Sequence, residues 1–171
     1  MQRTGPRLLL ITSEWPHRGR RLTAQPGPRS LVKQQAEALQ AAGASVEIFA
    51  FRGRGMLNYA AAWARLRPQL LADRYDLVHA QEAANGLLAL PKRVPLVVTV
   101  RRRSSRRFLH HLLALVLARR ADAVIVASAE LGRQLRTRKP IFVIGPDTDH
   151  QALTERLLAV YRSVLPGWSN R

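Results

Sequence analysis

The chain has 171 residues, no cysteine, and 28 lysines and arginines against 11 aspartates and glutamates, which gives a net charge of +17. This length suits one domain with a single core. The lack of cysteine excludes disulfides, thiolate metal sites and redox chemistry at sulfur. A field of this sign attracts polyanions, which include nucleic acids, anionic membranes and phosphorylated substrates.

The apolar runs of the chain are too short for membrane insertion. The run that begins at Leu8 has four residues, and no signal-peptide cleavage site follows it. The longest run, over residues 108–118, contains His110 and His111 and is shorter than a bilayer is thick. We therefore expect a cytoplasmic protein, with peripheral binding at the inner face of the membrane as an open alternative.

Strand and helix patterns alternate from the first residues onward. The apolar run that begins at Leu8 predicts a strand over residues 8–12 that is buried on both faces. After a loop rich in proline and glycine, Ser30 is the expected N-cap of a helix that ends at Gly43. A second strand over residues 46–51 precedes a helix over residues 57–72, which Pro68 should break or kink.

The rest of the chain repeats this alternation. The predicted order is a strand over 77–80, a short helix over 86–90, a strand over 96–100, a helix over 105–120, a strand over 124–127, a helix over 129–135 and a strand over 141–144.

Such an alternation implies right-handed crossovers and an α/β fold, a Rossmann-like doubly wound domain with a mostly parallel sheet of about six strands and helices on both faces. Ligands of such sheets bind beyond the carboxyl ends of the strands. The segments expected there are residues 13–29, 52–55, 79–85, 101–105 and 128–130.

Five short motifs follow one another along this alternation: TSEWP from Thr12, VEIF from Val46, YDLVHA from Tyr75, VVTV from Val97 and AVIVAS from Ala123. In order and spacing they resemble the N-terminal, acceptor-side half of a family-4 glycosyltransferase of the GT-B class, over about residues 7–145. The resemblance implies half of a GT-B fold. Gln81 stands where that family often has a second histidine, and Arg102 stands where it commonly has a glycine.

The resemblance and the sheet-edge rule together suggest acceptor or ligand contacts, while no catalytic residue can be assigned. Two of these candidates have a structural alternative, because His79 is equally a hydrogen-bonded core histidine and Ser128 equally a helix N-cap. Five histidines without clustered carboxylates do not make a metal site. The candidates are Glu14, His17, Arg18, His79, Gln81, Glu82, Arg101, Ser128 and Glu130.

The resemblance also implies a domain plan. Residues 1–146 correspond to the glycosyltransferase N-terminal domain, residues 147–165 to the family's final helix, which packs back on that domain, and residues 166–171 to a tail. The donor-binding domain of the family is missing between the first two. We therefore expect no cofactor on this chain alone, a nucleotide-sugar donor only with a donor-binding partner, and no activity of the isolated chain.

Arginine clusters flank an apolar stretch in the second half of the chain. They suggest an interfacial helix on anionic lipid, or an ordinary buried helix with solvated ends. The candidate membrane or polyanion contacts are Arg102, Arg103, Arg106, Arg107, Arg119 and Arg120.

Three hypotheses of function follow. The first is an acceptor-side glycosyltransferase domain, either a truncated relative or a subunit that binds a glycan or lipid-linked acceptor and works with a donor-domain protein. The second is a non-catalytic binding or scaffold protein, for instance a homodimer through the donor-facing surface. The third, polyanion or nucleic-acid binding, rests on charge alone, because Phe108 is the only aromatic residue among the arginine clusters.

Overall fold

The computed structural model describes residues 5–13, 28–52, 55–101, 108–145, 148–165 and 167–168. Its centre is one six-stranded sheet in which every neighbouring pair of strands is parallel, in the order β2-β1-β3-β4-β5-β6. This confirms the predicted α/β class. The strands are β1 (Arg7–Thr12), β2 (Ser45–Ala50), β3 (Leu77–Ala80), β4 (Leu96–Val100), β5 (Ala123–Val126) and β6 (Ile141–Val143).

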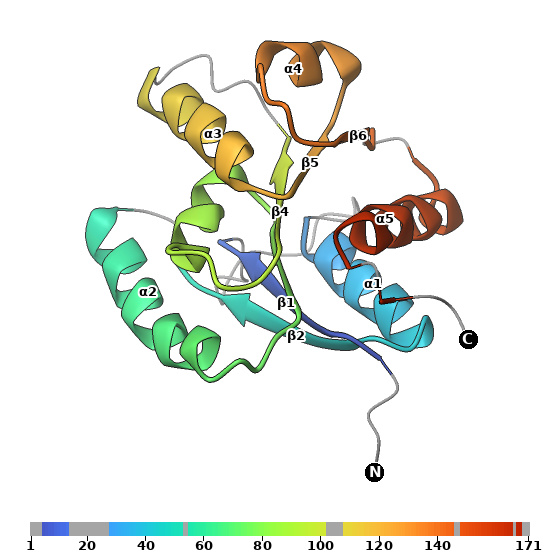
Figure 1. Ribbon diagram of the computed structural model, residues 1–171, viewed down its shortest axis with the longest axis horizontal. Helices are drawn as coiled ribbons and strands as arrows, with labels where there is room; N and C mark the ends of the chain where they lie inside the picture. The colour runs from blue at the N-terminus through green and yellow to red at the C-terminus, as the bar shows by residue number, and fades with distance from the viewer. Residues whose placement is uncertain are drawn as a thin grey trace, which may run out of the picture.

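Helices cover both faces of the sheet (Figure 1). One face packs against α2, α3 and a 3₁₀ helix, η1, while α1 and α5 lie side by side on the other. The short α4 lies next to β5 and β6. The helices are α1 (Pro28–Ala41), α2 (Met56–Leu71), η1 (Ala83–Ala89), α3 (Phe108–Arg120), α4 (Ala129–Gln134) and α5 (His150–Val164).

One helix start and one expected helix break differ from the sequence expectations. The first helix begins at Pro28, so Ser30 is not its N-cap; proline suits the first turn because its missing N–H would have no helical partner there. The second helix continues through Pro68 to Leu71 rather than breaking at it. The expected stop at Gly43 is confirmed, since its φ of +87° is one that glycine adopts without strain.

The core explains why the strands are apolar throughout. Leu8 and Leu10 face α1 and α5, whereas Leu9 and Ile11 face the opposite helices, and all four are fully buried. With both faces covered, neither set of alternating positions can be polar without a buried partner.

The last helix is part of this core. Leu157 and Tyr161 of α5 pack in one cluster with Leu8 and Leu77 of the sheet, and both are nearly or fully buried. The carboxylate of Asp149 begins the helix by accepting a hydrogen bond from the Ala152 N–H at 2.9 Å. None of the helices in the described ranges is both apolar enough and long enough to span a bilayer.

Candidate functional site

The candidate site lies where the direction of strand order reverses. The chain places β2 on one side of β1 and β3 on the other, and ligands of open parallel sheets bind at the carboxyl ends of the strands that meet there. Polar side chains gather at this edge from β1, β3, η1 and β4. They form two hydrogen-bonded networks, one toward each face of the sheet.

The first network ends on a carboxylate. Tyr59 Oη donates to Asn85 Oδ1 at 3.2 Å, Asn85 Nδ2 donates to Ser13 Oγ at 3.4 Å, and Ser13 Oγ donates to Glu82 Oε2 at 3.1 Å. Asn85 is fully buried, while Ser13 and Glu82 are half-buried. Burial, and to a lesser degree the charge of Glu82, raises the pKa of Tyr59 to about 12, so its hydroxyl stays a donor. The three hydrogen bonds of this network therefore run in one direction, from Tyr59 to the carboxylate of Glu82.

The second network is built around His79, which is fully buried on the face that α1 and α5 cover. Its Nδ1 lies 2.6 Å from Tyr161 Oη and its Nε2 lies 2.7 Å from Thr99 Oγ1. Burial, followed by the charge of Arg101, lowers the pKa of His79 to about 3. Burial also raises the pKa of Tyr161. Both groups are therefore neutral, and His79 has no direct contact with solvent.

Gln81 joins this histidine to the sheet edge. Its Nε2 donates to Gln35 Oε1 at 2.9 Å and lies 3.4 Å from His79 Nδ1, and its Oε1 accepts from Arg101 Nη2 at 3.1 Å. Since Nδ1 faces an N–H donor, the imidazole proton belongs on Nε2, where it is donated to Thr99. Gln81 is 2% exposed, whereas Arg101 is only partly buried.

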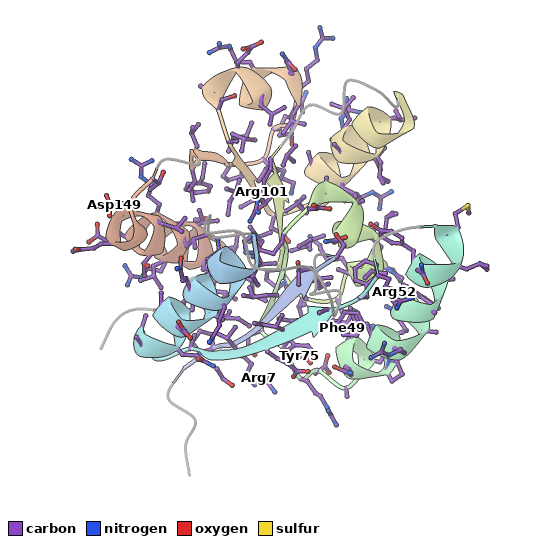
Figure 2. All side chains as sticks on the ribbon, turned by 180° about the vertical axis from the view of Figure 1, so that it is seen from behind. Arg7, Phe49, Arg52, Tyr75, Arg101 and Asp149 are labelled. Atoms are coloured by element: carbon purple, nitrogen blue, oxygen red, sulfur yellow. The ribbon has the colours of Figure 1, made fainter. Side chains whose placement is uncertain are left out.

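Charge pairing differs between the two edges of the sheet. At the amino edge, Arg7 pairs with Asp76 at 2.9 Å and Lys92 with Asp122 at 2.7 Å. At the carboxyl edge, Arg101 makes no ion pair with any carboxylate of the described ranges and contacts a neutral amide instead. Figure 2 shows Arg101 and Arg7 at these opposite edges.

Other predicted site residues lie elsewhere or have local roles. Ser128 Oγ accepts from the Leu131 N–H at 3.3 Å, which confirms the N-cap alternative, and Glu130 accepts from Gln134 along the same helix at 3.1 Å. Arg119 and Arg120 end α3 at the amino edge, on the far side of the sheet from Arg101. Outside the described residues lie Glu14, His17, Arg18, Arg102, Arg103, Arg106 and Arg107.

Sequence reasoning did not single out Gln35, Thr99 or Tyr161. Gln35 precedes Ala36 on the buried stripe of α1, and a glutamine beside such a stripe is a signal for a buried amide partner. No local pattern marks Tyr161 as a hydrogen-bonding residue, because its partner His79 is 82 residues away along the chain.

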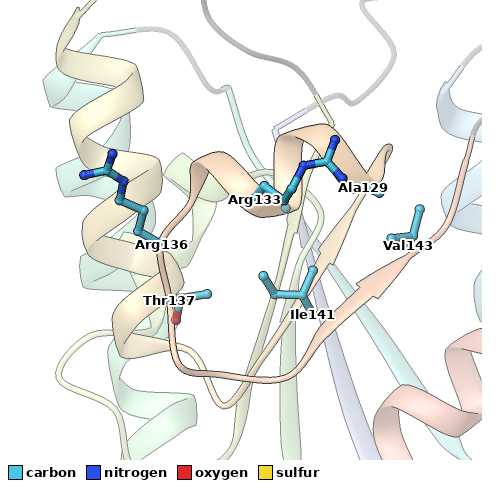
Figure 3. A pocket seen from close by; sticks show the side chains of 7 residues that line it. Ala129, Arg133, Arg136, Thr137, Ile141 and Val143 are labelled. Carbon is cyan, nitrogen blue, oxygen red and sulfur yellow. The ribbon is translucent and has the colours of Figure 1, made fainter.

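A pair of exposed apolar side chains and a surface hollow lie outside the two networks. Met56 and Leu57, in the first turn of α2 at the carboxyl edge, are 89% and 86% exposed. A hollow of about 370 Å³ lies between α4 and the edge strand β6 (Figure 3). Its lining is Ala129, Gly132, Arg133, Arg136, Thr137, Ile141 and Val143, which excludes every residue of the two networks. In the described part of the chain, no three histidines or carboxylates are grouped to hold a metal ion.

Solved structures share this fold. A chain of sucrose-phosphate synthase from Thermosynechococcus elongatus is similar with a TM-score of 0.69 and 16% identity, over 93% of this chain and 99% of that one. A second structure of the same synthase matches with a TM-score of 0.61 and 16% identity, over 84% of this chain and 49% of the other. The structure of Anabaena HepE in complex with UDP and glucose is similar with a TM-score of 0.56 and 19% identity, over 84% of this chain and 45% of HepE. The chain thus spans about half the length of the latter two.

Among curated proteins, none matches the chain significantly. The family described as Glycosyltransferase Family 4 matches residues 27–151. These residues include all of the strands except β1, and they include the carboxyl ends of β3 and β4 that carry Gln81, Glu82 and Arg101. The chain therefore belongs to glycosyltransferase family 4.

Proposed function

We propose that this chain is the acceptor-binding domain of a glycosyltransferase and that its acceptor binds at the carboxyl edge of β1, β3 and β4. The observation that carries the proposal is the pair of networks at this edge. Each presents one partly exposed charged group. Arg101 is held by the buried Gln81, and Glu82 is held by the half-buried Ser13, which in turn accepts from the buried Asn85. Rigid support of this kind is typical of ligand-binding side chains and is seldom needed by solvated surface charges.

Glu82 suits the task of holding an acceptor hydroxyl. One carboxylate oxygen, Oε2, receives the Ser13 hydroxyl, while Oε1 accepts no hydrogen bond from the described residues. A carboxylate accepts strong hydrogen bonds from hydroxyl groups. Glu82 would thus bind and orient the hydroxyl that receives the sugar, and orientation alone can supply a large part of a rate enhancement.

The donor half of the reaction is proposed to need a donor-binding partner. The solved HepE complex contains UDP and glucose, and this chain spans 45% of that protein. We accordingly propose that a nucleotide-sugar donor is bound by a donor-binding partner and that this chain alone binds none.

The first prediction concerns Glu82→Gln. The tagged chain is purified from its native host at moderate salt, and a partner protein should co-purify with it. The eluate should then transfer sugar to an acceptor from at least one of a panel of labelled nucleotide sugars. The Glu82→Gln chain should recover the same partner but transfer sugar at least about tenfold more slowly, because the hydrogen bond to the acceptor hydroxyl loses the charge of the carboxylate.

The matched control is Glu37→Gln, which makes the same change in charge at an exposed position on α1 where Glu37 pairs with Lys33. It should transfer at the wild-type rate. An eluate without transfer activity, or one with equal activity for all three chains, would contradict the proposed function.

A second candidate, a homodimeric binding protein, is favoured by the exposure of Met56 and Leu57. Two neighbouring large apolar side chains at a ligand-binding edge are typical of an interface. The chain should then have the mass of a dimer in solution, and the double variant Met56→Ser/Leu57→Ser should have the mass of a monomer. A monomeric wild-type chain that loses its co-purifying partner through this double substitution assigns the same surface to the donor-binding partner instead.

A further inference from the structure

We propose that Arg101 is an anion-binding residue of the acceptor site and that the C-terminal helix α5 positions it, through the buried series Tyr161, His79 and Gln81. The acceptor is then a molecule with a phosphate or another anionic group near its reactive hydroxyl. This inference rests on the proposed function for the identity of the ligand as an acceptor, while the anion site itself can be tested on the chain alone.

Most N–H donors of the Arg101 guanidinium have no partner among the described residues. Of its five N–H groups, one on Nη2 is engaged by Gln81, and no carboxylate of the described ranges pairs with it. Gln81 fixes the direction of the guanidinium without neutralising it, since an amide carries no charge. A glutamate in the same place would form an ion pair. The result is an oriented cation at an accessible edge, which suits bidentate binding of phosphate or carboxylate.

The orientation of Gln81 is itself determined by its neighbours. Arg101 carries only N–H donors, so it requires the oxygen of Gln81, and the NH₂ group of Gln81 then faces Gln35 Oε1 and His79 Nδ1. The reverse orientation would place Nε2 against the N–H groups of Arg101. Gln81 is 2% exposed, so water cannot repair such a mismatch at low cost.

Tyr161 connects this arrangement to α5. Its hydroxyl lies 2.6 Å from His79 Nδ1, the nitrogen that Gln81 also faces, while Thr99 occupies the other nitrogen. With Tyr161 donating, Nδ1 remains an acceptor and the imidazole keeps the tautomer that Gln81 needs. Without that hydroxyl, the tautomer that carries its proton on Nδ1 would oppose the N–H of Gln81. Tyr161 and His79 are therefore positioning residues, since neither reaches the edge itself.

The test is the affinity of the purified chain for inorganic phosphate, measured by calorimetry at one fixed ionic strength, because salt screens such contacts. Arg101→Gln should weaken binding about tenfold, as expected for lost hydrogen bonds to a charged ligand. Arg120→Gln removes the same charge at the amino edge and should bind phosphate like the wild type. Equal affinity of the wild type and Arg101→Gln would overturn the proposal.

The positioning role is tested by Tyr161→Phe, which removes one hydroxyl and keeps the ring. It should weaken phosphate binding about threefold, because orientation is lost while charge is kept. In the Arg101→Gln background the same substitution should have no effect on affinity, since Tyr161 acts only through Arg101. A Tyr161→Phe chain that melts at a lower temperature but binds phosphate like the wild type would assign Tyr161 a purely structural role.

The source of the anion is distinguished with two further probes. Tighter binding of glucose 6-phosphate than of glucose, lost in Arg101→Gln, identifies a soluble phosphorylated acceptor. Sedimentation with phosphatidylglycerol vesicles but not with phosphatidylcholine vesicles, again lost in Arg101→Gln, identifies an anionic lipid headgroup. If Arg101→Gln changes neither, the anion site is wrong. The proposed function can fail in the transfer assay while phosphate binding persists, so the two failures are separable.

Discussion

Replacing Tyr161 with alanine is expected to lower the free energy of unfolding by about 4 kcal/mol, as truncation of a fully buried aromatic side chain does. The ring makes an edge-to-face contact with His79, with centroids 5.6 Å apart, and stacks on Trp168 at 6.3 Å. The substitution would leave a cavity beneath α5 and remove the hydroxyl next to His79 Nδ1. Urea unfolding followed by circular dichroism measures the change.

Two companion variants separate packing from hydrogen bonding. Tyr161→Phe keeps the ring and should cost about 1–2 kcal/mol, the penalty of leaving a buried acceptor without its donor. Tyr59→Phe removes the hydroxyl that donates to Asn85 on the opposite face and should cost about as much. A Tyr161→Ala chain within about 1 kcal/mol of the wild type would mean that α5 does not pack on the sheet in solution.

Acidification is expected to destabilise the fold through His79. In the unfolded chain this histidine takes up a proton near its ordinary pKa of 6.5, while in the folded chain burial lowers the pKa to about 3. Between these two values the unfolded state binds the extra proton. The contribution of His79 to stability is therefore complete above pH 6.5 and falls by about 1.4 kcal/mol per pH unit as the pH drops toward 3.

The measurement is the free energy of urea unfolding at a series of pH values, compared with His79→Gln. Carboxylates such as Asp76, whose pKa is lowered by its hydrogen bond to Arg7, also titrate in acid, but they contribute to both curves. The difference between the curves therefore isolates His79. The variant should be less stable at neutral pH and should lose stability more slowly on acidification. Parallel curves would show that His79 is not buried in its neutral form.

The sheet could be predicted well from the sequence because its signals are local. The bounds of β3 and β4 agree with the predicted ranges to the residue, since each is a short, mostly apolar segment with a charged or polar residue directly after it. The start of α1 was predicted wrongly: Ser30 was expected as its N-cap, whereas the helix begins at Pro28, because proline also suits a first turn and the local pattern does not rank the two signals.

The candidate site was only partly predictable. The sheet-edge rule located Gln81, Glu82 and Arg101 at the carboxyl edge, and the structure places all three there. It did not decide between His79 as a ligand contact and His79 as a core histidine, because this depends on which face of β3 each residue takes and on a helix near the other end of the chain. Burial of His79 beneath Tyr161 is a tertiary contact with no local signature.

Hydrogen exchange of the chain, alone and in complex with the partner recovered from the host, tests most directly whether the carboxyl edge is the working surface. We predict slower exchange in the complex at residues 55–58 and 81–86, which include the first turn of α2 and the segment after β3. Residues 72–76 and 119–122, at the amino edge, should exchange as they do in the free chain. Protection confined to the amino-edge segments would contradict the assignment of both the acceptor site and the partner-facing surface.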